Sequence, residues 1–138
     1  MNVYLDSSVV VRWLRREAPS LSGWGGWDHI YASVLLRVET LRTIDRIRLS
    51  AAVDDAQVAE LMARARAVFD VVEFIPLSAA ILARASQSFL TELGTLDALH
   101  LSTALRLVEA GSIDLTFLTH DTELAVAARS VSLAVEGA

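Results

Sequence analysis

Two carboxylates stand at the ends of apolar stretches that are typical of buried β-strands. Asp6 follows residues 3–5, and Asp121 comes just after residues 115–119. A buried and unpaired charge costs several kcal/mol, so each side chain needs a hydrogen-bond donor, a cation or a metal ion as a partner.

Two further acidic residues lie among apolar neighbours on predicted helices. Glu39 stands between Val38 and Leu41, and Asp97 is flanked by apolar residues two positions after Thr95. Such positions favour side chains that face inward. Asp97 alone is ambiguous, because an acidic residue in the first turn of a helix is favoured by the helix dipole. Each of the four acids, taken singly, has a structural explanation.

Four carboxylates in one pocket would repel each other, by roughly 3 kcal/mol per pair at about 5 Å and an effective dielectric of about 20. A divalent cation removes that conflict. The chain has no cysteine, so its ligands must be oxygen or imidazole, a donor set that suits hard cations. The acids therefore indicate a metal site, provided that the fold brings them together.

Strand and helix patterns alternate along the chain. This alternation predicts an α/β fold with a mostly parallel central sheet flanked by helices. The expected strands cover residues 2–6, 29–32, 71–75, 115–119 and 132–135; the expected helices cover residues 7–16, 33–48, 54–69, 78–90, 95–110 and 122–129. Ligands bind at the carboxyl ends of the strands in such a sheet, which places Asp6 and Asp121 on one edge.

The composition limits the class of protein. The 138 residues suffice for a single domain, residues 1–138, and no apolar run approaches the length of a membrane span. We therefore expect a cytoplasmic protein. Apolar residues make up 54% of the chain, which suggests that another chain covers part of its surface.

All twelve basic residues are arginine. This excludes mechanisms that use a catalytic lysine, including those typical of receiver and haloacid-dehalogenase-like phosphoryl-transfer domains. Guanidinium groups suit bidentate phosphate binding, although a biased genomic base composition would give the same pattern.

Four short motifs carry a resemblance to a known family. LDSS at Asp6, RVETLR around Glu39, TLDALHLSTAL around Asp97 and LTHD at Asp121 resemble the four acidic motifs of the PIN domain, in the same order. The resemblance spans essentially the whole chain and is closest to the VapC-type ribonuclease toxins of toxin–antitoxin pairs.

The resemblance implies a site and an activity. The four acids would bind Mg²⁺ or Mn²⁺, with Ser8 and Thr119 as supporting hydroxyls, and a metal-activated water would cleave structured cellular RNA. It also implies a cognate antitoxin protein and a homodimer. The alternative is a non-catalytic PIN-like module that binds RNA or protein; such modules usually lose acidic positions, whereas this chain has all four. The number of ions and the RNA target stay open.

Arginines and histidines near the acids have more than one interpretation. Arg42 and Arg46 follow Glu39 along nearly one helical stripe and would bind RNA phosphates, or Arg42 would simply pair with Glu39 on an exposed helix face. His100 and His120 are candidates for hydrogen-bond donors or proton carriers beside the acids, or for structural roles.

Two tryptophans in a glycine-rich stretch have either a binding role or a structural role. Trp24 and Trp27 would stack on unpaired bases or on a partner, or fold back onto the core of their own chain.

Overall fold

The computed structural model describes residues 1–16, 25–50 and 53–138. The residues described form five strands and six helices. In chain order these are β1 (Asn2–Leu5), α1 (Ser7–Leu14), β2 (His29–Ser33), α2 (Leu35–Leu49), α3 (Asp55–Val71), β3 (Glu73–Ile75), α4 (Ala79–Ala85), α5 (Thr95–Gly111), β4 (Leu115–Leu118), α6 (Thr122–Ser130) and β5 (Ala134–Glu136).

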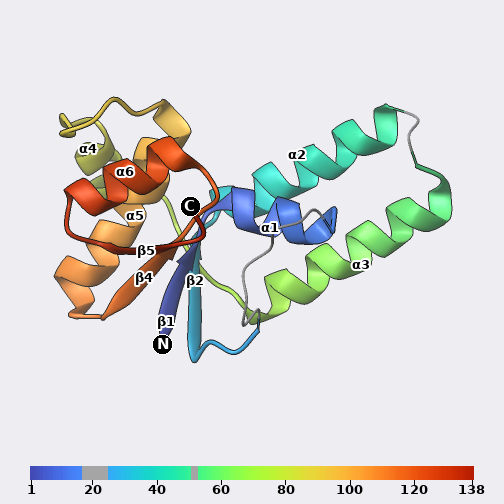
Figure 1. Ribbon diagram of the computed structural model, residues 1–138, viewed down its shortest axis with the longest axis horizontal. Coiled ribbons are helices and arrows are strands. Elements are labelled where there is room, and N and C mark those ends of the chain that lie inside the picture. Colours follow the sequence, from blue (N-terminus) through green and yellow to red (C-terminus); the bar gives the residue numbers. More distant parts are fainter. Residues whose placement is uncertain (17–24, 51–52) are drawn as a thin grey trace.

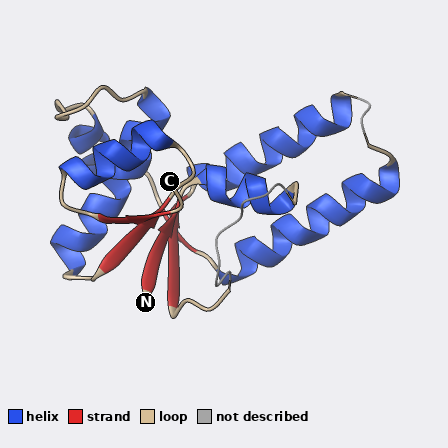
Figure 2. Ribbon diagram, in the orientation of Figure 1, coloured by secondary structure: helices blue, strands red, loops and turns tan. Residues whose placement is uncertain are grey.

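The strands form one sheet in the order β3-β2-β1-β4-β5, and all four pairings are parallel. The expected α/β fold with a parallel sheet is confirmed (Figure 2). The chain adds strands on one side of β1 and later on the other side, so the direction of winding changes between β1 and β4. Ligands bind at such switch points in open parallel sheets.

Alternation along β1 explains why helices cover both faces of the sheet. Val3 and Leu5 pack into one apolar cluster with residues of α1, α2 and α3. Tyr4 faces the opposite side and packs with α5, α6 and Phe117 of β4. Successive side chains in a strand point to opposite faces, so this short strand contributes to both halves of the core. Figure 1 shows the two sets of helices, with α2 and α3 extending away from the sheet as a pair.

Aspartate is the N-cap residue of two helices that directly follow a strand, α1 and α6. The Asp6 side chain accepts a hydrogen bond from the backbone of Ser8, and Asp6 is the N-cap of α1. Asp121 likewise caps α6. A carboxylate at a helix N-terminus is stabilised by the free amide groups and by the helix dipole.

One predicted helix is too long. The helix after Ser78 ends at Ala85 and does not continue to about residue 90. The Ser86 hydroxyl donates to the carbonyl of Leu82, so a side chain satisfies a backbone group at the point where the helix stops.

Two other helices, α2 and α5, begin without a hydrogen bond from the side chain of the N-cap residue. Ser33 ends β2, and its hydroxyl accepts a hydrogen bond from Leu35 without being the N-cap of α2. Thr95 is inside α5, and Gly94 is the cap residue. None of the described helices is long and apolar enough to cross a membrane.

Candidate active site

Asp6 lies at the carboxyl end of the central strand and is almost completely buried. Its Oδ2 accepts hydrogen bonds from the hydroxyls of Ser8, at 2.5 Å, and Thr119, at 2.9 Å. Leu5 pairs with Leu118 in the sheet, and this register sets Thr119 beside Asp6. Oδ1 accepts no hydrogen bond from any described residue, so one oxygen of this buried carboxylate stays available to a ligand.

The Thr119 hydroxyl also links Asp6 to Asp121. It accepts a hydrogen bond from the backbone N–H of Asp121 at 3.0 Å. The Asp121 side chain accepts from the backbone of Glu123 and Leu124 at the start of α6. The two acids therefore follow adjacent strands, and a shared hydroxyl fixes the backbone between them.

Glu39 reaches the site from the second turn of α2. Its Oε1 accepts a hydrogen bond from His100 Nε2 at 2.5 Å, and its Oε2 accepts one from the Ser7 hydroxyl at 3.1 Å. Its side chain is 23% exposed, so the carboxylate is held by two donors while it still meets solvent.

Asp97 lies in the first turn of α5 and is half-buried. Burial raises the pKa of Asp97 to about 6, and the negative charges of Asp6 and Asp121 add to this rise. Glu39 adds a smaller contribution in the same direction, and His100 opposes it. The four acids come from four different segments, and their charges act on one another at one edge of the sheet.

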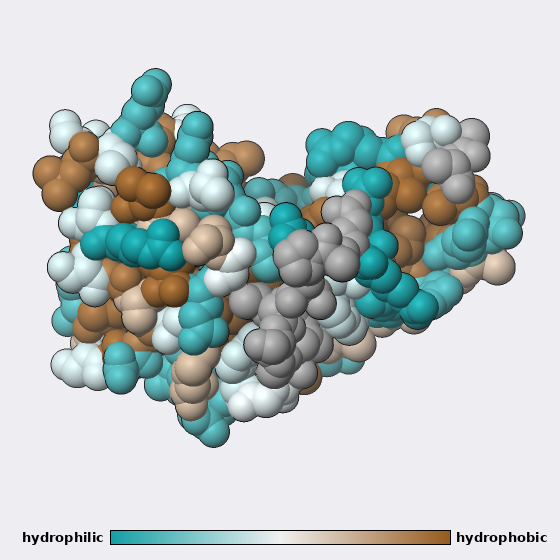
Figure 3. All heavy atoms as spheres, viewed as in Figure 1, coloured by the Kyte–Doolittle hydropathy of each residue, from teal (hydrophilic) through white to brown (hydrophobic). Residues whose placement is uncertain are grey.

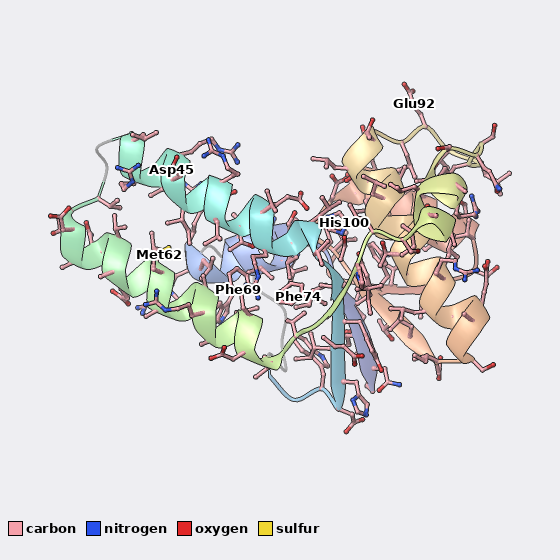
Figure 4. The ribbon with its side chains drawn as sticks, turned by 180° about the vertical axis from the view of Figure 1, so that it is seen from behind. Asp45, Met62, Phe69, Phe74, Glu92 and His100 are labelled. Atoms are coloured by element: carbon pink, nitrogen blue, oxygen red, sulfur yellow. The ribbon has the colours of Figure 1, made fainter. Side chains whose placement is uncertain are left out.

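Two buried polar side chains, His100 and Tyr4, form a hydrogen-bonded connection to Glu39. Burial lowers the pKa of His100, but the hydrogen bond and charge of Glu39 more than offset this effect, so that the net shift is upward. The Tyr4 hydroxyl lies 2.9 Å from His100 Nδ1, and burial raises the pKa of Tyr4. Figure 4 shows His100 where α2 approaches the sheet.

Sequence reasoning missed two of the residues that contact this site. Ser7 was predicted only as a helix residue, and Tyr4 only as a strand residue. A serine within LDSS is visible in the sequence, but nothing local indicates that it reaches Glu39 on another helix. Tyr4 has a residue type common in strands and carries no signal of its own.

The two candidate arginines of α2 have partners other than Glu39. Arg42 pairs with Asp45 at 3.1 Å and not with Glu39, and Arg46 donates to Thr43. The two arginine side chains lie on the exposed surface of α2.

His120 and Trp27 have contacts of their own within the chain. His120 contacts the carbonyl of Gly137 through Nδ1, and its backbone N–H donates to Ser8. Trp27 packs against the apolar cluster beneath α1 and α3, as the core alternative predicted, and Trp24 lies outside the described residues.

Oxygen ligands of this kind fit Mg²⁺ or Mn²⁺. In the part of the chain that is described, no three histidine, aspartate or glutamate side chains are arranged to hold one ion. Glu39 is turned toward His100 and Ser7, and Asp121 toward the amides of its own helix. The donor chemistry fits a hard cation, and the mutual repulsion around Asp97 is the feature that such a cation would relieve.

The chain belongs to the PIN domain family, whose model matches residues 3–130. Proteins of this family are nucleases and generally use divalent metals. No curated protein matches the chain by sequence.

Two solved structures share the fold. One is VapBC2 from Rickettsia felis bound to a DNA fragment from its promoter, with a TM-score of 0.66 and 15% identity over 99% of this chain and 98% of that one. The other is FitAcB from Neisseria gonorrhoeae, with a TM-score of 0.64 and 17% identity over 98% and 96%.

Proposed function

We propose that this protein is a Mg²⁺- or Mn²⁺-dependent endoribonuclease that acts as the toxin of a toxin–antitoxin pair. The observation that carries the proposal is the buried Asp6 carboxylate at the end of the central strand, held by Ser8 and Thr119 and linked through Thr119 to Asp121. The pKa of Asp97, raised mainly by burial and also by the charges of Asp6, Asp121 and Glu39, supports it. Membership of a nuclease family and the fold shared with VapBC2 and FitAcB support it.

Each acid has a distinct role in the proposed mechanism. Asp6 and Asp97, near the switch point, are the proposed main ligands. Glu39 completes the site in the orientation that His100 and Ser7 give it, and Asp121 completes it after its side chain rotates. When bound, the cation neutralises charge on the phosphate and lowers the pKa of a water that attacks it. Ser8 and Thr119 orient Asp6 by donating to Oδ2.

Arg42 and Arg46 are the proposed contacts to the RNA backbone. They extend from α2, the helix that carries Glu39, and both are exposed. Phosphate contacts of this kind position an RNA without reading its sequence, so the target RNA depends on other features of the complex.

The antitoxin is proposed to dock on the helical pair that extends from the sheet. A groove of about 350 Å³ lies between α1, α2 and α3. Four of its lining residues are apolar, Leu14, Ile47, Val53 and Leu61, and the other five are polar or charged, Arg15, Arg16, Gln57, Glu60 and Arg64. Figure 3 shows brown, apolar surface between α2 and α3, bordered by hydrophilic side chains. A basic side chain from the same partner would pair with the acids and block the site. Exposed Leu82, Leu90 and Leu96 support self-association through a separate surface.

The decisive experiment is cleavage of total cellular RNA by purified protein, with and without Mn²⁺. We expect cleavage only with the metal, loss with chelator, and a fall of about 100-fold or more for Asp97→Asn. Glu109→Gln, an exposed substitution near the other end of α5, is the matched control. RNA binding without cleavage at any metal concentration would support the non-catalytic module instead.

A second experiment tests the toxin role in cells. Expression of the wild-type chain should arrest growth, and expression of Asp97→Asn should not. Co-expression with the small open reading frame next to its gene should restore growth, and the two products should purify together. Harmless expression of folded and active wild-type protein in several hosts would count against a toxin.

A further inference from the structure

A continuous line of buried hydrogen bonds ends on Glu39. The backbone N–H of Ser33 donates to the Tyr4 hydroxyl at 3.1 Å, this hydroxyl lies 2.9 Å from His100 Nδ1, and His100 Nε2 lies 2.5 Å from Glu39 Oε1. The four residues come from β2, β1, α5 and α2. Tertiary structure alone assembles this line.

Hydrogen-bonding rules assign the proton on His100 Nε2. An ionised carboxylate only accepts, so the nitrogen facing Glu39 must carry a hydrogen whether the ring is neutral or charged. Nδ1 faces the Tyr4 hydroxyl, which is free to donate because it already accepts from the Ser33 amide. Neither ring nitrogen presents a lone pair to the acidic site, so His100 does not ligate a metal through this geometry.

The ring of His100 has little freedom to move. Its side chain is 1% exposed, and its edge packs against Tyr4 with ring centroids 6.1 Å apart. Tyr4 is itself fully buried and stacked on Phe117 at 5.2 Å. Such packing locks the rotamers on which a positioned side chain depends.

Glu39 needs support of this kind. Its side chain has three rotatable bonds and lies partly in solvent, so without fixed donors it would sample many orientations. His100 and Ser7 each hold one of its two oxygens. Carboxylate ligands of metal sites depend on such hydrogen-bonded partners for their orientation.

We propose that His100, supported by Tyr4, is a positioning residue that holds Glu39 in place for a divalent cation. This inference rests on the proposed metal-dependent function. It deepens that function by assigning His100 to a donor role and excluding it as a ligand.

Mn²⁺ itself is the probe for the test. We would measure its dissociation constant by electron paramagnetic resonance on the full chain, without RNA. His100→Leu keeps an apolar side chain of similar size but removes the donor, and should raise the dissociation constant about 10- to 100-fold. His100→Gln places an amide N–H near the position of Nε2 and should restore most of the affinity.

Two further variants make the comparison specific. Tyr4→Phe keeps the ring stack and removes only the hydroxyl, so the constant should rise less, about 2- to 10-fold. Ser102→Ala changes a fully buried residue on α5 whose hydroxyl has no partner among the described residues. It is the matched control and should bind Mn²⁺ as the wild type does. Circular dichroism in chelator would identify any variant that fails to fold, in which case His100→Gln and Tyr4→Phe carry the test.

The outcomes separate the two proposals. Wild-type protein that binds no Mn²⁺ would overturn both the proposed function and the role of His100. Wild-type binding with equal affinity in folded His100→Leu would overturn only the role of His100. Equal losses in folded His100→Leu and His100→Gln would also overturn it, because ring shape and not the donated hydrogen bond would then matter.

Discussion

Thr119 donates a hydrogen bond to Asp6 across the two central strands, from Oγ1 to Oδ2 at 2.9 Å. The same hydroxyl accepts from the Asp121 amide. A single buried oxygen therefore couples two of the candidate metal ligands, and it stands at the point where the winding of the sheet changes direction.

Replacing this hydroxyl should destabilise the fold. Thr119→Val keeps the shape of the side chain but leaves a buried carboxylate oxygen and a backbone N–H with fewer partners. We expect a loss of about 1–3 kcal/mol in the free energy of unfolding, measured by urea denaturation in chelator. Thr116→Val, within β4 three residues before Thr119, is the control and should change stability by less than about 0.5 kcal/mol. Equal stability of the two variants would contradict the prediction.

The raised pKa of Asp97 predicts a dependence of stability on pH. Its folded pKa of about 6 lies above the value of about 3.9 for an unfolded chain, so the folded metal-free state binds more protons between these values. The stability contribution is therefore complete below pH 4 and is lost as the pH rises through 6. Because Asp97 is only half-buried, solvent screening limits this loss to about 1 kcal/mol.

Asp97→Asn tests this effect, because an amide does not titrate. The difference in unfolding free energy between wild type and Asp97→Asn, in chelator, should shift by about 1 kcal/mol in favour of the variant between pH 4 and pH 8. Exposed Asp114→Asn is the control. A difference that stays constant with pH would show that Asp97 is not perturbed.

Metal binding should stabilise the folded protein. A ligand that binds only the native state at 100 times its dissociation constant adds about 2.7 kcal/mol. We therefore expect the melting temperature to rise with Mn²⁺, and this rise to disappear in Asp6→Asn. Differential scanning calorimetry measures both, with Asp70→Asn on the exposed surface of α3 as the control. An identical rise in Asp6→Asn would remove that residue from the ligand set.

The arginines of α2 should contribute to RNA affinity through charge. In a background of Asp97→Asn, which prevents cleavage, Arg42→Ala and Arg46→Ala should each weaken RNA binding. Each should also reduce the slope of log affinity against log salt by roughly 0.7 for single-stranded RNA. Filter binding at several salt concentrations provides the slope. Arg106→Ala, exposed on α5, is the control, and the prediction fails if all three variants behave alike.

The local sequence pattern was sufficient to predict the parallel sheet and the edge of the sheet at which Asp6 and Asp121 lie. Apolar runs of strand length, each followed by a helical pattern, predicted β1, β4 and the parallel arrangement. Because parallel strands end at a common edge, they also predicted that Asp6 and Asp121 lie together. The end of α4 at Ala85 was not predicted, because a serine that bonds back to the helix resembles any other polar helix residue in the sequence.

The four acids and their order are read directly from the sequence. The sequence also determined the two strands that end at Asp6 and Asp121, because strand formation there depends on the pattern of neighbouring residues. Only the tertiary structure decided what holds Glu39. His100 lies 61 residues from Glu39 and 96 from Tyr4 along the chain, and no periodic pattern links such distant positions. Their contact follows from the packing of α2 and α5 against β1, where a buried polar group must find a partner or pay the cost of losing water.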